Sequence, residues 1–143
     1  MTKGRIKMRN IANLFKKIRS FEIVTLHTSG MRHVTDYEIV MKGDEAEVSQ
    51  YAIGYRDGEE VRQLQKRALC PAERALKLMN KCSLLSWDGY HGNRPKGIKD
   101  GTNFIFKAIV NGGKEIYATG SQRFPLHYSD FKEGLYEILK KGS

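Results

Sequence analysis

The spacing of apolar residues first changes along the chain at residue 21. A stripe at helical spacing comes first: Ile11, Leu14, Phe15 and Ile18. Asn10 precedes this stripe as a helix N-cap. From Phe21 onward apolar and polar residues alternate, which is typical of strands with one buried face. The pattern predicts a basic N-terminal segment with a short amphipathic helix over residues 1–20 and a separate folded domain over residues 21–143.

Four strands are expected in the first half of that domain, over residues 21–28, 35–41, 46–55 and 59–69. The last of these is ambiguous, because Val61, Leu64 and Ala68 also fit the spacing of a helix. The preceding Asp57-Gly58 favours a type I′ hairpin turn, since both of its central positions need a positive φ. We therefore predict that residues 59–69 return as a strand.

The second half is expected to hold a helix, a loop, a hairpin and a closing helix. Pro71 suits the first turn of a helix that continues to Cys82. Residues 84–101 are rich in Gly, Asp, Asn and Pro and indicate a loop. Two strands around Asn111-Gly-Gly113 follow, and Ser129 is the expected N-cap of the last helix. Hairpin connections favour an α+β fold, a single domain with an antiparallel sheet of about five to six strands and three helices packed on it.

Composition agrees with one ordinary domain. At 143 residues and 40% hydrophobic content the chain can form one core without a disulfide or a metal ion. No apolar run approaches the ~18 residues that span a membrane, and no signal peptide is recognisable, so a cytoplasmic protein is expected. Cys70 and Cys82 lie at opposite ends of a predicted helix, about 18 Å apart, which predicts free thiols.

The net charge of +9 is concentrated at the N-terminus. Residues 1–20 contain seven bases and no acid, and these are the candidates for binding an anionic partner: Lys3, Arg5, Lys7, Arg9, Lys16, Lys17 and Arg19. A second basic stretch covers residues 62–81. A basic amphipathic helix can meet phosphates or an anionic membrane surface. We expect its apolar stripe to dock on the domain, which leaves the charge available to an anionic polymer.

The densest group of binding side chains is in the predicted loop, and its members are Trp87, Asp88, Tyr90, His91 and Arg94. One interpretation makes them a ligand-binding lip with aromatic walls. The other places Trp87 in the core and makes Asp88-Gly89 a tight turn. We favour the second interpretation, because Asp-Gly indicates a turn wherever it occurs.

Signatures of catalysis and metal binding are not recognised. None of His27, His33, His91 and His127 has a second ligand at zinc spacing. Gly120-Ser121 belongs neither to a nucleophile elbow nor to a phosphate-binding loop. We predict no catalytic residue, no metal site and no cofactor.

Several short motifs occur in a familiar order: SWDGY at residues 86–90, GIKDGT at 97–102, NGG at 111–113 and GSQRFP at 120–125. In these motifs the chain resembles a family of small uncharacterised bacterial proteins with a closing helix, over about residues 37–140. The resemblance implies a shared fold and a strand at residues 59–69, and it implies no activity.

The sequence therefore favours a non-enzymatic binding or protein-interaction module. A nucleic-acid-associated protein that uses residues 3–19 and 62–81 is the first alternative, and surface aromatics beside Lys or Arg on the sheet would favour it. A small enzyme with a site around residues 87–101 is the second, and a deep pocket with converging polar groups would favour that one.

Overall fold

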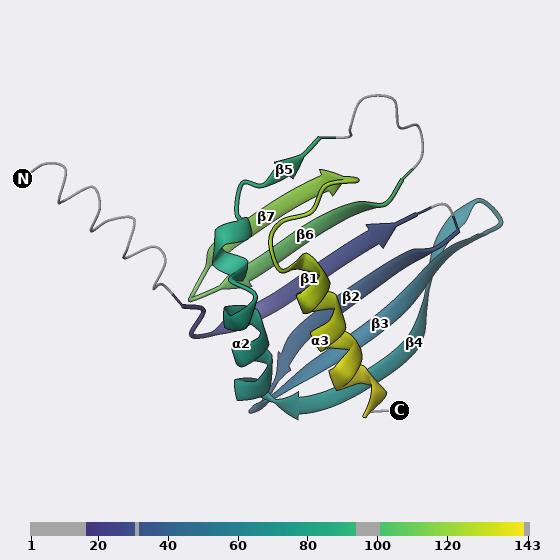
Figure 1. The fold of residues 1–143 in the computed structure, drawn as a ribbon. Coiled ribbons are helices and arrows are strands. Elements are labelled where there is room, and N and C mark those ends of the chain that lie inside the picture. The colour runs from purple at the N-terminus through teal and green to yellow at the C-terminus, as the bar shows by residue number, and fades with distance from the viewer. Residues whose placement is uncertain (1–16, 31, 94–100, 142–143) are drawn as a thin grey trace, which may run out of the picture.

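A computed structural model describes residues 17–30, 32–93 and 101–141. Within these ranges one twisted sheet holds all seven strands, in the order β4-β3-β2-β1-β6-β7-β5 (Figure 1). The strands are β1 (Phe21–Ser29), β2 (Val34–Lys42), β3 (Glu45–Arg56), β4 (Glu59–Pro71), β5 (His91–Gly92), β6 (Asn103–Val110) and β7 (Lys114–Ser121). Every neighbouring pair is antiparallel except β5 and β7, which are parallel.

Two helices, α2 (Ala72–Lys81) and α3 (Tyr128–Lys140), pack on the same face of the sheet (Figure 1). A short 3-10 helix, η1 (Leu84–Trp87), follows α2. The core between these layers combines the inward side chains of the central strands with the apolar stripe of α3. Trp87, Phe104, Phe106, Leu135 and Leu139 are each at most 1% exposed, as the alternation of the strands and the helical stripe predict. None of the described helices has the length and apolar character needed to cross a membrane.

The α+β class and the mainly antiparallel sheet are confirmed, but the number of strands is seven rather than five or six. The additional strand is β5, which lies within the stretch predicted to be a loop. It has two residues and pairs with β7 across a distance of 28 positions in the sequence. A strand this short has no alternation that could be recognised before its partner is known.

The ambiguous stretch at residues 59–69 is a strand, within β4, as predicted. Asp57 and Gly58 have φ values of 53° and 82°, as a type I′ turn requires. The first residues of α2 and α3 differ from those predicted. Pro71 ends β4, and α2 begins at Ala72.

The closing helix begins at Tyr128, so Ser129 is not its N-cap. His127 occupies the cap position with a φ of 70°, and its Nδ1 lies 3.0 Å from Asp130 Oδ2. The chain enters the helix early because the Tyr128 N–H donates to the Pro125 carbonyl oxygen at 3.2 Å. Burial of the Tyr128 ring beside Phe124 stabilises this entry.

Ile18, the last residue of the predicted N-terminal stripe, packs in the core of the domain. Ile18 is 3% exposed and belongs to the core. Its N–H donates to Asn80 Oδ1 at 2.8 Å, and Asn80 Nδ2 donates to the Ile18 carbonyl oxygen at 3.0 Å. Residues 17–20 are not helical. The rest of the predicted N-terminal helix lies outside the described residues.

Both cysteines are buried and free, as predicted. Burial raises the pKa of the Cys82 thiol from 9.0 to about 11, and it also raises the pKa of Cys70. Because the thiolate is the reactive form, the native protein should react slowly with iodoacetamide at pH 8. Intact-mass measurement should find no adduct after brief exposure and two adducts after the same exposure in denaturant. Rapid labelling of the native protein at pH 8 would contradict this burial.

Candidate functional site

Trp87 lies in the core rather than on a binding lip. It is 1% exposed, and its Nε1–H donates to the Leu126 carbonyl oxygen at 3.0 Å. Its ring meets Phe106 edge-on at a centroid distance of 4.9 Å and Phe131 at 5.7 Å. The side chain therefore ties η1 to the sheet and to α3.

The neighbours of Trp87 hold this loop against β7. Asp88 Oδ1 accepts from the Tyr117 N–H at 3.0 Å, and His91 Nδ1 lies 3.0 Å from Thr119 Oγ1. Tyr90 is partly buried, with its ring 6.2 Å from that of Phe104. Arg94 lies outside the described residues. The structure thus brings four of the five candidate residues together, mainly through contacts that join the loop to the sheet.

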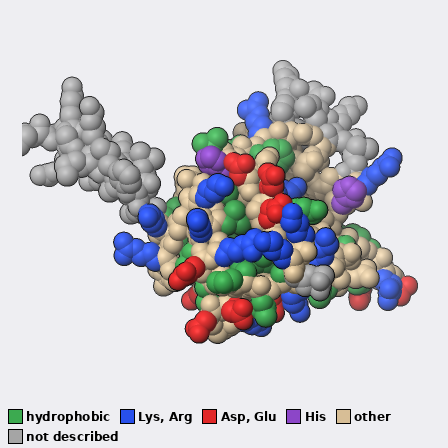
Figure 2. Space-filling view, turned by 60° about the horizontal axis from the view of Figure 1, so that its bottom comes forward, with side chains coloured by type: hydrophobic (Ala, Val, Ile, Leu, Met, Phe, Trp, Pro, Cys, Tyr) green, Lys and Arg blue, Asp and Glu red, His purple; other side chains and the backbone are tan. Residues whose placement is uncertain are grey.

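Of the seven N-terminal bases, only Lys17 and Arg19 lie in the described residues, and both are exposed. Lys3, Arg5, Lys7, Arg9 and Lys16 lie outside them. Seen from the lower edge of Figure 1, Lys and Arg side chains form a band across the molecule, with acidic side chains on both sides of it (Figure 2). The described surface is therefore mixed in charge on this side.

The opposite face of the sheet is covered by none of the described helices or strands (Figure 1). We call it the open face. Alternation and strand register place outward residues of six strands on it, and they include Ile23, Thr25, His27, Asp36, Glu38, Glu47, Ser49, Tyr51, Arg62, Leu64, Arg67, Leu69, Ile105, Lys107, Ile109, Glu115, Tyr117 and Thr119. The sequence analysis did not single out this surface.

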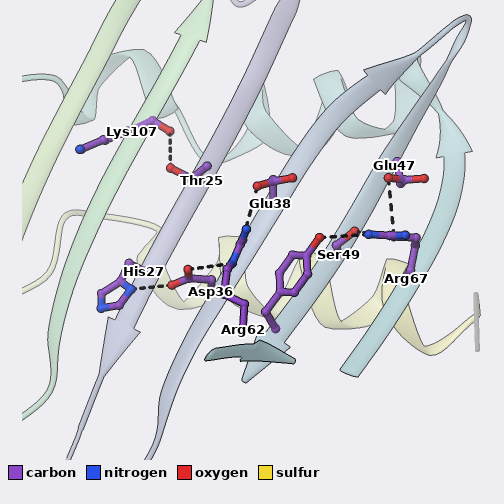
Figure 3. A network of polar contacts seen from close by, with 10 residues as sticks. Thr25, His27, Asp36, Glu38, Glu47, Ser49, Arg62, Arg67 and Lys107 are labelled. Atoms are coloured by element: carbon purple, nitrogen blue, oxygen red, sulfur yellow. Dashed lines mark hydrogen bonds and ion pairs between the residues drawn. The ribbon is translucent and has the colours of Figure 1, made fainter. Parts of the chain in front are cut away.

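A connected set of polar contacts crosses the open face from β1 to β4 (Figure 3). His27 Nδ1 lies 2.5 Å from Asp36 Oδ1, and Asp36 Oδ2 lies 3.5 Å from Arg62 Nε. Arg62 also reaches Glu38 and places its Cζ 3.9 Å from the centre of the Tyr51 ring. These contacts hold the Arg62 guanidinium over an aromatic ring and beside two carboxylates.

The network continues through Tyr51 to Arg67. Arg67 Nη2 donates to the Tyr51 hydroxyl oxygen and Arg67 Nε donates to Ser49 Oγ, both at 3.0 Å. Glu47 Oε1 lies 3.6 Å from the same Nε. The two arginines are thus held in place by neighbouring strands, which lowers the side-chain entropy that they would lose on binding a partner.

An apolar hollow lies beside the network, where β1, β6 and β7 meet. Ile23, Ile109 and Tyr117 line it, and its volume is about 540 Å³. Tyr117 is 43% exposed, and the Lys107 Nζ lies 5.8 Å from the centre of its ring. A second hollow of about 430 Å³ adjoins it through Thr25 and Lys107 and includes His27. The open face therefore combines exposed apolar and aromatic groups with ordered charges.

The open face is close to neutral. Among the open-face residues named above, three bases (Arg62, Arg67 and Lys107) stand against four acids (Asp36, Glu38, Glu47 and Glu115). Within the described ranges, no cluster of three or more His, Cys, Asp or Glu side chains is placed to hold a metal ion. The chemistry that the face offers is therefore mixed: apolar contact, aromatic stacking and paired charges.

The His27–Asp36 pair has a signal in the sequence that becomes visible once the β1–β2 register is known. His27 pairs directly with Asp36 across these strands. Alternation marks the odd-numbered positions of β1 and the even-numbered positions of β2 as outward. A prediction of the strand register would therefore have placed His27 beside Asp36. Arg62 and Tyr51 carry no such signal, because the register of β3 and β4 shifts between Gln50 and Tyr51, so that Tyr51 pairs with Leu64.

Comparisons with known proteins add nothing to this geometry. The chain matches no family model, no curated protein sequence and no solved structure.

Proposed function

We propose that this protein is a non-enzymatic binding module and that a protein partner packs on the open face of its sheet. The observation that carries the proposal is the apolar hollow around Tyr117. It continues through the second hollow to Arg62 of the Arg62–Tyr51–Arg67 network. Tyr117 and Ile105 are 43% and 38% exposed on neighbouring strands of a surface that none of the described elements covers.

The chemistry of this surface matches what protein interfaces use. Interface cores are enriched in Tyr and Arg, and a few such residues contribute most of the binding energy. Tyr117 supplies a large ring next to Ile23 and Ile109, and a partner that fills the hollow would remove all three from water. Around them, paired charges provide a polar rim whose geometry is set before binding.

Tyr117→Ala should reduce the affinity for the partner by roughly 30-fold or more, which corresponds to the ~2 kcal/mol typical of a binding hot spot. The partner would first be captured with the wild-type chain from its native cell and then titrated against purified variants. Tyr136→Ala is the matched control, because Tyr136 is 56% exposed on α3, on the other face. Equal losses for both variants, or no loss for Tyr117→Ala, would exclude the open face as the binding surface.

A nucleic-acid partner is the second candidate, and a specific observation favours it. Two surface tyrosines lie beside cations, Tyr51 under Arg62 and Tyr117 near Lys107, as in sheets that stack bases on aromatic rings. The near-neutral open face argues against it, because phosphate binding requires an excess of positive charge. In the same capture experiment, nuclease-sensitive material whose binding falls steeply with salt would support nucleic acid. Deleting residues 1–9, which removes four bases, would then weaken that binding.

A further inference from the structure

We infer that this chain's own N-terminal segment, residues 1–16, packs on the apolar hollow of the open face and competes there with the partner. As a statement about regulation the inference rests on the proposed function, since it concerns the same surface. The packing itself can be measured without any partner.

The position of the chain at residue 17 makes this contact possible. Asn111 fixes the entering backbone, because its Oδ1 accepts from the Arg19 N–H at 2.7 Å and its Nδ2 donates to the Lys17 carbonyl oxygen at 3.1 Å. Asn111 lies in the turn between β6 and β7, the two strands that line the hollow with β1. Ile23 in the lining follows Lys17 by only six positions, so the segment begins at the end of the sheet where the hollow lies.

The segment is long enough to cover the hollow. Sixteen residues extend about 24 Å as a helix and up to roughly 50 Å when extended. An eight-residue strand such as β6 extends about 26 Å, so either form can run along the lining strands. The tether also raises the local concentration of the segment to about millimolar, so that a weak intrinsic affinity is sufficient for occupancy.

The chemistry of the segment complements that of the hollow. Its predicted stripe offers Ile11, Leu14 and Phe15 to a lining that includes Ile23, Ile109 and Tyr117. Residues 1–16 contain five bases and no acid. Glu115 lines the hollow, is exposed, and forms no ion pair with any other described residue. A basic amphipathic segment therefore finds both an apolar surface and an acid that pairs with none of the described bases.

The contact can be tested in the full-length protein with a nitroxide label at Asn13→Cys, since the two native thiols are buried. Residue 13 falls off the predicted stripe, so the label should not block packing. Amide NMR signals of Ile23, Ile109 and Tyr117 should lose most of their intensity, whereas those of Lys132 and Tyr136 on α3 should keep theirs. Adding Leu14→Asp and Phe15→Asp to the labelled chain should restore the lost signals.

Charge provides a second, independent variant. Glu115→Lys should reduce the signal loss at the hollow, and Glu133→Lys on α3 is the matched control, which should leave it unchanged. Uniform signal loss over both faces, or a loss centred on α3, would overturn the inference. Loss that occurs only between labelled and unlabelled molecules in a mixture would overturn it too, because a second copy would then supply the segment.

The outcomes separate this inference from the proposed function. Leu14→Asp with Phe15→Asp should increase the affinity of the full-length protein for its captured partner, because a competitor is removed. If the label detects no packing but Tyr117→Ala still abolishes capture, the inference fails and the proposed function stands. If packing is detected but Tyr117→Ala leaves capture unchanged, the proposed function and the competition both fail, and the open face is a covered surface of the folded chain.

Discussion

Trp87→Ala should destabilise the protein by about 3–5 kcal/mol, the cost of removing a large aromatic side chain from a packed core. The Trp87 ring contacts the rings of Phe106, Phe131 and Tyr128. The substitution also removes the indole N–H, which leaves the Leu126 carbonyl oxygen without its donor. Since η1, the sheet and α3 all meet at this side chain, no single element can move to fill the cavity. Thermal unfolding should show Tm lower by roughly 10–20 °C for a chain of this size.

A conservative variant separates the contribution of packing from that of the hydrogen bond. Trp87→Phe retains most of the aromatic contact and loses the indole N–H, so its cost should be clearly smaller than that of Trp87→Ala. Tyr136→Ala, which removes an exposed ring from α3, should change the free energy of unfolding little. If Trp87→Ala unfolded at the wild-type temperature, the core position of Trp87 would be wrong.

Gly120→Ala should also destabilise the fold, by about 1–3 kcal/mol or somewhat more. Gly120 pairs with Phe104 in β6 and with Gly92 in β5. A Cβ atom at this position would overlap the Arg123 carbonyl oxygen and the Phe104 ring carbon Cε1. Neither neighbour is the end of a flexible side chain, so the turn after β7 or the core itself would have to move. Chemical denaturation at equilibrium measures the loss directly.

Gly54→Ala is the matched control for that variant. Gly54 also lies within a strand, but a Cβ added there meets no heavy atom within 4 Å. Its φ is not positive, so alanine should be neutral or slightly stabilising through the lower entropy of the unfolded chain. Equal costs at both positions would show that the loss at Gly120 comes from backbone freedom and not from the close contact.

Local patterns were sufficient to predict most of the elements. Alternation identified β1, β2 and β6. Every second side chain is buried along β6 and from Val24 onward in β1, whereas in β2 only Ile39 is buried. Asp57-Gly58 correctly decided β4 against a helix, since a turn with two positive φ values can be formed by few residue pairs. The N-cap of α3 was missed by two residues, because the entry of the helix depends on contacts of Tyr128 with Pro125 and Phe124 that no local signal encodes.

The residues of the open face are brought together by pairing between strands that are far apart in the sequence. The sequence by itself determined that the net positive charge is concentrated at the N-terminus and that the strands form hairpins. It also favoured a position in the core for Trp87. Only the tertiary structure determined that α2 and α3 pack on one face, so that no described helix or strand covers the other. The same pairing brought His27 to Asp36 and Arg62 to Tyr51, and it joined β5 to β7. The physical reason is that strand order and register join residues far apart in the chain, whereas periodicity and turn chemistry act only between near neighbours.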